Sequence, residues 1–227
     1  MPKVACTRVK QTLQEFEGYP VPEDLAELHN RPDRSKQWVP SLSDLSVDEY
    51  RAALDSAEWF RFSFVRNPYT RLFSAYKNKI RFLGDPDPVF GYVRDEIFRA
   101  YRYPPRSGKQ AGVVAFRDFV RFVCEAPGNR MDAHWAPQTQ LLRLDLIKYD
   151  FIGRFENFQS DLTQILGRLS ASQEIKERAQ IKVNQTSQNY PTPPFDRETA
   201  SWVYDVYRDD FVNFGYDRES WLFDDEP

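Results

Sequence analysis

The sequence predicts an α/β fold, a domain with a parallel central sheet flanked by helices. Two short segments, residues 59–65 and 149–152, have the apolar and aromatic character of buried strands. Amphipathic segments with helical spacing precede, separate and follow them. Strands that alternate with helices pack as a sheet covered by helices. The 227 residues suit a single domain, which we place over 1–227.

The first helices are predicted from apolar spacing and from capping residues. A loop within residues 4–17 leads into a helix, whose apolar positions at helical spacing are Val9, Leu13 and Phe16. Residues 18–45 are polar and contain proline, so we expect an irregular segment. Ser46 and Glu49 have the spacing of a capping box, which predicts a helix over about 47–56.

Proline after a capping residue marks two later helices. Asn67-Pro68 opens a helix that we expect to reach about residue 82, and Asp87-Pro88 opens one to about residue 102. Asp196 caps a final helix to about residue 214, which Gly215 ends. The other expected helices cover about 115–124, 157–169 and 172–182, and loops are expected over 103–113 and 184–194.

Composition excludes several classes of protein. Apolar residues make up 41% of the chain and charged residues 29%, which is ordinary globular usage and excludes a disordered tail. No stretch approaches about 18 consecutive apolar residues, so the sequence predicts no membrane span. A net charge of −3 does not favour nucleic-acid binding. Two cysteines and two histidines provide neither a disulfide framework nor a dedicated zinc site, so we expect a reducing compartment and no metal.

Basic residues are concentrated in two stretches that contain no acidic residue. Residues 61–81 hold Arg61, Arg66, Arg71, Lys77, Lys79 and Arg81. The first ten residues hold Lys3, Arg8 and Lys10. In an acidic protein such stretches favour binding of a compact anion, and the alternative is a solvated basic helix face.

The common nucleotide-binding and hydrolase motifs are absent. The sequence contains no G-x-x-x-x-G-K-[ST], G-x-G, G-x-S-x-G or H-E-x-x-H pattern. Two segments remain. In FSFVRNPYTRLFSAYKNK, residues 62–79, Arg66 lies where the strand ends and can bind phosphate through two hydrogen bonds, while Ser74 lies on the following helix. Residues 2–8 place small side chains before a helix, where backbone N–H groups bind phosphate.

These two segments resemble a known family, the carbohydrate-type (family 2) sulfotransferases. FVRNPYTRLFSAYKNK resembles the family's 3′-phosphate-binding motif, and PKVACTRVK is similar to its 5′-phosphosulfate-binding loop. HWAPQTQLLRLDLIKYDFIGRFENFQSDL, residues 134–162, resembles its central segment. Residues 184–190 and the later YDVYRDDFVNFGYD resemble its C-terminal part. The likeness covers the chain apart from about 84–112.

The resemblance implies an activity, a donor and a set of site residues. The family transfers the sulfuryl group of 3′-phosphoadenosine 5′-phosphosulfate (PAPS) to an acceptor hydroxyl, usually on a sugar, without a metal. The acceptor would be a glycan or a small glycoside. Lys3 would contact the 5′-phosphosulfate and act in catalysis, and Arg66 and Ser74 would bind the 3′-phosphate. The other residues expected at the nucleotide are Ala5, Cys6, Thr7, Arg8, Arg154, Asn184 and Ser187.

A base must accept the acceptor's proton, and His134 is our choice because histidine titrates near neutral pH. The alternative for His134 is a structural histidine that orients its loop. Glu156 is a second candidate base, although a carboxylate at a helix start is commonly structural. His29 lies in a polar segment and is expected to be a surface residue.

The chain departs from the family pattern in its first residues. The family's phosphosulfate loop follows a core strand, whereas here the loop starts at residue 2, so we expect the first strand to be missing or truncated. Arg8 stands where the family often has serine or threonine, and Ala136 where it often has arginine. A rival hypothesis is therefore a catalytically impaired relative that binds nucleotide but lacks the first core strand.

A third class, a kinase-like phosphotransferase, is disfavoured because the chain has no Walker lysine and no magnesium-ligand motif. For the compartment we expect a cytoplasmic location if the chain is complete. A lumenal location is expected if an upstream anchor has been lost, because the family's animal members are lumenal and membrane-anchored.

Overall fold

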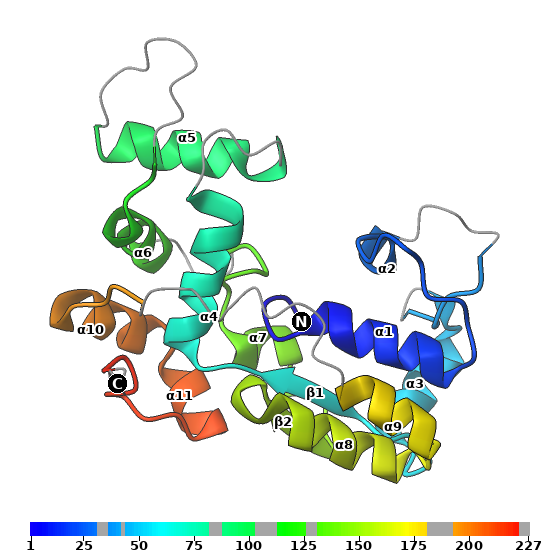
Figure 1. Cartoon of the computed structure of the whole chain (residues 1–227). Helices are drawn as coiled ribbons and strands as arrows, with labels where there is room; N and C mark the ends of the chain where they lie inside the picture. Colours follow the sequence, from blue (N-terminus) through cyan, green and yellow to red (C-terminus); the bar gives the residue numbers. More distant parts are fainter. Residues whose placement is uncertain are drawn as a thin grey trace. The chain divides into compact units, whose positions relative to one another are not determined.

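A computed structural model describes residues 1–30, 36–41, 44–81, 88–102, 113–125, 131–180 and 193–222 (Figure 1). The chain divides into two compact units. The first unit comprises Met1–Val65 and Leu142–Asn189, and the second comprises Arg66–Leu141 and Tyr190–Pro227. Each unit has its own apolar core. The single domain over 1–227 stays a prediction.

The first unit contains the sheet. Strands β1 (Phe62–Val65) and β2 (Phe151–Arg154) are parallel, with Phe62 opposite Phe151 and Val65 opposite Arg154. The parallel pairing of two strands with helices around them confirms the predicted α/β class. Among the described residues these two strands form the sheet, and the missing first strand stays a prediction.

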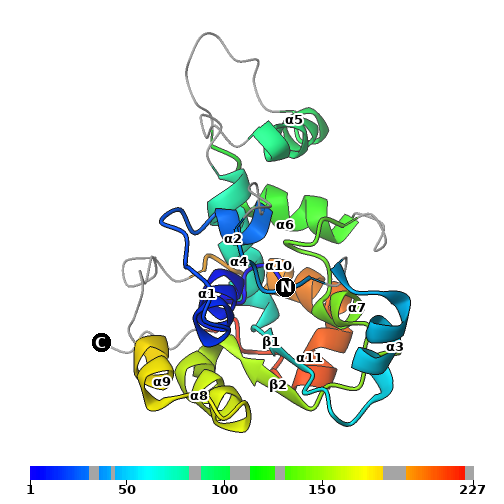
Figure 2. The ribbon, with the colours of Figure 1, turned by 90° about the vertical axis from the view of Figure 1, so that its right-hand side faces the viewer.

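Helices cover the sheet of the first unit. α8 (Phe158–Arg168) follows β2 through the short 3₁₀ turn η5 (Phe155–Asn157) and packs against it. α9 (Gln173–Gln180) packs against α8 and against α1 (Cys6–Phe16), and Figure 2 shows α8 and α9 side by side. These helices confirm three of the predicted segments, because their apolar faces have the spacing on which the predictions rested.

The core of the first unit is small and closely packed. Its buried residues are Val4, Phe64, Leu162, Ile165, Leu166, Ala171 and Ala179. Gly153 of β2 lies against the Phe64 ring, and a Cβ at Gly153 would be 2.6 Å from the Cε1 atom of that ring. Val4 is 2% exposed and fixes the N-terminal turn to this core.

Two further helices belong to the first unit. α3 (Val47–Asp55) begins with the predicted capping box, in which the Glu49 amide donates to the Ser46 hydroxyl and the Ser46 amide donates to the Glu49 carboxylate. α2 (Glu27–Asn30) is a short helix inside the segment that we expected to be irregular. Leu28 of α2 is buried, and α2 packs against α1.

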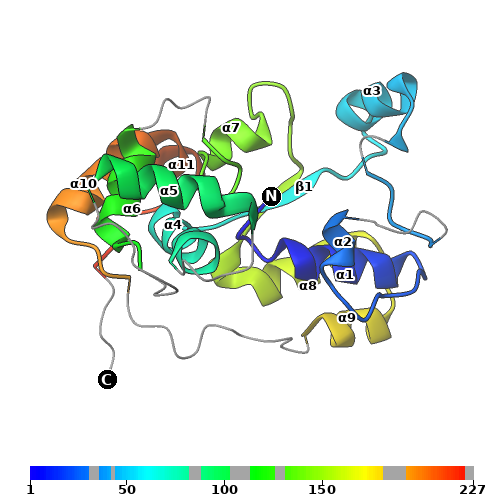
Figure 3. The ribbon, with the colours of Figure 1, turned by 90° about the horizontal axis from the view of Figure 1, so that it is seen from above.

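The second unit is helical, with an aromatic core. α4 (Pro68–Ala75) begins at the predicted Asn67 cap and continues as the π-helix η2 (Tyr76–Ile80). The other helices among the described residues are η3 (Pro88–Phe90), α5 (Gly91–Ala100), α6 (Phe116–Glu125), α7 (Gln138–Leu142), α10 (Arg197–Val206) and α11 (Arg208–Phe214). Figure 3 shows α6 beside α10, and these helices pack together.

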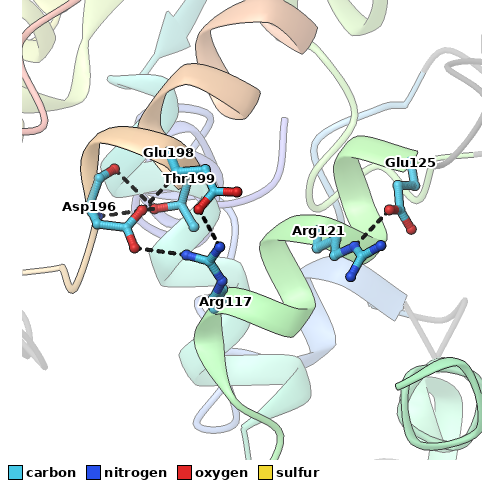
Figure 4. Close-up of polar contacts among 6 residues, drawn as sticks. All are labelled: Arg117, Arg121, Glu125, Asp196, Glu198 and Thr199. Carbon is cyan, nitrogen blue, oxygen red and sulfur yellow. Dashed lines mark hydrogen bonds and ion pairs between the residues drawn. The ribbon is translucent and has the colours of Figure 1, made fainter. Parts of the chain in front are cut away.

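Figure 4 shows the polar edge of the α6–α10 pair. Asp196 caps α10 by accepting from the Thr199 amide at 2.8 Å, as its sequence position predicts. Arg117 of α6 donates to both Asp196 and Glu198, and Arg121 pairs with Glu125. These pairs are exposed, so they contribute little to stability. The Arg117 pairs connect α6 to the start of α10, whereas the Arg121–Glu125 pair lies within α6.

The predicted final helix is interrupted. Tyr207 separates α10 from α11 with φ −105° and ψ 20°, so the single helix expected over 196–214 is wrong. Tyr207 is fully buried, and its hydroxyl donates to the Trp135 carbonyl. Neither glycine nor proline marks this break in the sequence. Gly215 ends α11 in the left-handed conformation, as predicted.

No helix in the described parts of the chain combines the length and the apolar character that crossing a membrane requires. The predicted loops over 103–113 and 184–194 lie mostly outside the described residues.

Candidate functional site

The N-terminal turn of the first unit has the backbone of an anion-binding loop. Lys3 and Ala5 have positive φ angles of 68° and 60°, and α1 begins at Cys6. The first helical hydrogen bond runs from the Val9 amide to the Ala5 carbonyl at 3.0 Å. The amides of the three residues before Val9 therefore have no acceptor within the helix. The first turn of this helix contains no acidic residue, so the positive end of the helix dipole is not neutralised by a carboxylate there.

Side chains in this turn are held by neighbouring helices. Arg8 donates to Gln11 at 3.1 Å and to the Arg178 carbonyl, so its guanidinium is directed at α9, and partial burial lowers its pKa. A role for Arg8 at the anion would therefore fall to its backbone amide, and that role stays a prediction. Thr7 is hydrogen-bonded to Nε2 of His29 at 2.9 Å. His29 is exposed as expected, but it contacts a predicted site residue.

In the second unit, Arg66 is fixed by a side-chain amide. Its backbone amide donates to Oε1 of Gln138 at 2.9 Å, and its carbonyl accepts from Nε2 of Gln138 at 2.8 Å. Nε of its guanidinium donates to the Thr70 hydroxyl at 3.0 Å. The side-chain amide of Gln138 therefore makes two hydrogen bonds that fix the backbone of Arg66, the residue that follows β1.

Three basic residues after β1 and one serine form what we call the cationic face: Arg66, Lys77 and Arg81, together with Ser74. Ser74 is half-buried on α4, and Lys77 lies three residues further along in η2. Burial, followed by repulsion from Arg66 and Arg81, lowers the pKa of Lys77 to about 8. Like charges held this close favour a bound anion. The sequence analysis included Lys77 in the basic stretch but did not list it among the candidate site residues. Its spacing of three residues from Ser74 is the feature that could have added it to that list.

His134 also belongs to the second unit. Its Nδ1 lies 2.6 Å from Oδ1 of Asp132, which also accepts from the His134 backbone amide at 2.8 Å. Because a carboxylate only accepts, Nδ1 carries the proton of the neutral ring and Nε2 carries the lone pair. That is the tautomer a general base needs, although a structural histidine would make the same bonds. Trp135, its neighbour, is buried in the core.

A buried polar network that sequence reasoning missed supports this segment. Asp210 is fully buried and accepts from the backbone amides of Gln138 and Thr139 at 2.8 and 2.7 Å. Arg71 is also buried and donates to the carbonyls of Ala136 and Ala133. Burial raises the pKa of Asp210 and lowers that of Arg71. The network thus positions both the His134 segment and Gln138. The sequence feature that could have revealed the network is the presence of Arg71 and Asp210 among the apolar positions of their helices.

The remaining predicted residues are less informative. Arg154 ends β2, and its amide donates to Asp161 at 2.7 Å. Glu156 is exposed in η5, and Cys6 is a half-buried free thiol. Asn184 and Ser187 lie outside the described residues.

Comparison with known proteins identifies the family of the chain. A profile of the Sulfotransferase family matches residues 1–217. The chain belongs to the sulfotransferase family. No solved structure matches this sulfotransferase.

Curated relatives of the sulfotransferase carry the same family name. It is 35% identical to carbohydrate sulfotransferase 14 of Danio rerio, over 78% of this chain and 46% of that protein. It is 31% identical to carbohydrate sulfotransferase 14 of Homo sapiens, over 78% of this chain and 44% of that protein. To carbohydrate sulfotransferase 11 of Rattus norvegicus the identity is 27%, over 98% of this chain and 64% of that protein. The sulfotransferase thus spans less than half of the length of the two carbohydrate sulfotransferase 14 proteins and less than two thirds of the length of carbohydrate sulfotransferase 11.

One expectation from the sequence is wrong. We expected a cytoplasmic location for a complete chain, but the curated relatives are carbohydrate sulfotransferases, which act in the Golgi lumen. The inference failed because a low cysteine count shows only that a fold needs no disulfide framework. It does not show that the fold avoids an oxidising compartment.

Proposed function

We propose that this sulfotransferase binds PAPS and transfers its sulfuryl group to a hydroxyl of a carbohydrate, either a glycan or a small glycoside. The observation that carries the proposal is the cationic face, where repulsion from Arg66 and Arg81 adds to burial in depressing the pKa of Lys77. Family membership supports the sulfate donor, and the names of the relatives support the carbohydrate acceptor.

Apart from Lys77, the proposed donor contacts are those that the family resemblance implies, and they are given for each unit by itself. In the first unit, the amides of Cys6, Thr7 and Arg8 bind the 5′-phosphosulfate, with Ala5 shaping the turn and Lys3 supplying positive charge. In the second unit, Arg66 and Ser74 bind the 3′-phosphate, and Lys77 adds a cation. Arg154, Asn184 and Ser187 complete the proposed nucleotide contacts.

The proposed reaction is an in-line displacement at sulfur. The acceptor oxygen forms a bond to sulfur while the bond between sulfur and the bridging oxygen of the 5′-phosphate breaks, which releases 3′,5′-ADP. Lys3 stabilises the negative charge that develops on the bridging oxygen. His134 accepts the hydroxyl proton, with Glu156 as the alternative base. Positioning and cationic stabilisation supply the catalysis, as in phosphoryl transfer.

Calorimetry with two nucleotides tests the donor assignment. We expect 3′,5′-ADP to bind much more tightly than 5′-AMP, because only the former carries a 3′-phosphate. Arg66→Ala should remove charge-assisted bonds worth about 1.5–3 kcal/mol, or roughly tenfold to a hundredfold in affinity. Arg66→Lys should recover only part of this, because an ammonium cannot reproduce the planar fork.

Arg99→Ala is the matched control, since Arg99 is exposed on α5 and its Nε donates to the nearby Asp95 carbonyl. It should leave both affinities unchanged. Equal affinity of the unmodified protein for 3′,5′-ADP and 5′-AMP would refute the donor assignment. Tight binding of 3′,5′-ADP without sulfuryl transfer to any carbohydrate tested would instead favour a catalytically impaired relative.

A further inference from the structure

Both ring nitrogens of His29 face α1. Nε2 lies 2.9 Å from the Thr7 hydroxyl oxygen, and Nδ1 lies 3.3 Å from Nζ of Lys10. Lys10 also donates to the Leu28 carbonyl at 3.1 Å, which ties the same turn of α2 to α1. All of these residues belong to the first unit, so the contacts lie within one compact body.

The donors and acceptors assign the proton on His29. A lysine ammonium has three N–H donors and no acceptor, so Nδ1 of His29 must accept from Lys10. In the neutral ring the proton is then on Nε2, which donates to the Thr7 oxygen. The hydrogen of the Thr7 hydroxyl is not used in this bond. It can be donated to a second acceptor, while the His29 bond fixes the position of the oxygen.

Thr7 lies in the first turn of α1, beside the amides that precede the first helical hydrogen bond. We propose that His29 is a positioning residue, which holds the Thr7 hydroxyl so that its hydrogen is donated to the anion bound at this turn. The anion is a phosphate or phosphosulfate monoester. The inference rests on the proposed function, in which this anion is the 5′ group of the donor. A preoriented donor spends no binding energy on ordering the side chain when the anion arrives.

Substitutions of His29 and Thr7 test whether the hydrogen bond from His29 orients the Thr7 hydroxyl. In His29→Gln the side-chain amide nitrogen can replace Nε2 and donate to Thr7. His29→Ala removes the donor, and Thr7→Val removes the hydroxyl at nearly constant shape. Lys36→Ala is the control, because Lys36 is on the same segment but pairs with Glu27.

The measurement is calorimetric affinity for two probes, 3′,5′-ADP and 3′-AMP, which differ only in the 5′-phosphate. We expect His29→Ala to weaken 3′,5′-ADP binding by about tenfold, the loss of one hydrogen bond to a charged group, and to leave 3′-AMP binding unchanged. His29→Gln and Lys36→Ala should remain within about twofold of the unmodified protein. Combining His29→Ala with Thr7→Val should be no worse than Thr7→Val alone, because the two residues act through one bond.

Several results would overturn the inference. Among them are equal weakening of the binding of both probes, additive losses in the double variant, and a His29→Gln protein as impaired as His29→Ala. Normal binding by His29→Gln with complete loss of turnover would also overturn it, because His29 would then transfer the proton itself. If His29→Ala does not fold, the Gln and Thr7→Val variants still give the decisive comparison. A protein that binds neither 3′,5′-ADP nor PAPS before any substitution refutes the proposed function, whereas unchanged binding by His29→Ala refutes only this inference.

Discussion

The charge state of Lys77 provides a test of whether the cationic face binds an anion. Its pKa is lowered to about 8 by burial and by repulsion from Arg66 and Arg81. Below that pH the ammonium is charged before and after an anion binds. Above it, binding must take up a proton, so affinity decreases as the pH rises.

We therefore predict that affinity for 3′,5′-ADP falls between pH 8 and pH 9 by at most about tenfold per pH unit, the limit for one linked proton. The nucleotide phosphates do not cause this fall, since their second pKa is about 6. Calorimetry in two buffers of different ionisation enthalpy measures the proton uptake. Lys77→Arg, which stays charged, should bind equally at both pH values. A flat profile in the unmodified protein would place Lys77 outside the site.

His134 is the residue for which two roles make different predictions. If it is the general base, His134→Ala should lower turnover by about 10²–10⁴-fold while nucleotide affinity is kept. His134→Asn should be equally inactive, because its amide can replace Nδ1 beside Asp132 but has no group at Nε2.

If His134 only orients its loop through Asp132, the Asn variant should be nearly normal. Turnover assays accompanied by thermal melts decide between the roles. An active and stable His134→Asn protein would direct attention to Glu156 as the base.

At the scale of elements, the packing of β2 against β1 depends on Gly153. A Cβ there would lie 2.6 and 2.9 Å from two atoms of the Phe64 ring and 3.1 Å from Cβ of Asp161. Phe64 is 3% exposed and surrounded by core residues, so its ring has no space into which to move. The extra methyl group must therefore displace one of the two strands or α8.

We predict that Gly153→Ala lowers the free energy of unfolding by about 1–3 kcal/mol, the usual cost of overpacking a core. Gly167→Ala is the matched control, because Gly167 lies in α8 with no heavy atom near its would-be Cβ within 4 Å. That change should raise stability by roughly 0.5–1 kcal/mol through helix propensity. Urea unfolding curves measure both values, and equal effects of the two changes would contradict the packing argument.

The ends of several helices could be predicted from the local sequence alone. The capping box of α3, the Asp196 cap of α10, the Asn67-Pro68 start of α4 and the Gly215 end of α11 all occur where the sequence predicts them. Each of these signals acts within about four residues. The break at Tyr207 was missed because its partner, the Trp135 carbonyl, is 72 residues away.

For the whole molecule, donor binding should appear as added stability. A ligand that binds only the folded chain, at a concentration one hundred times its Kd, contributes about 2.7 kcal/mol. For a chain of this size we therefore predict that 3′,5′-ADP raises the Tm by roughly 5–10 °C. Scanning calorimetry or a dye-based melt measures the shift. Arg66→Ala at the same nucleotide concentration should show a much smaller shift, and an equal shift with 5′-AMP would contradict recognition of the 3′-phosphate.

The sequence by itself determined the α/β class, the two parallel strands, most helix starts and the two candidate phosphate-binding segments. These follow from spacing and capping within short stretches, and from the order of motifs along the chain. Only the tertiary structure decided how those segments are supported. Asp210 meets the Gln138 amide across 72 residues, and His29 meets Thr7 across 22. The pKa of Lys77 depends on burial and on charges brought near it by folding. Such effects depend on distance in space, which residue spacing along the chain does not specify.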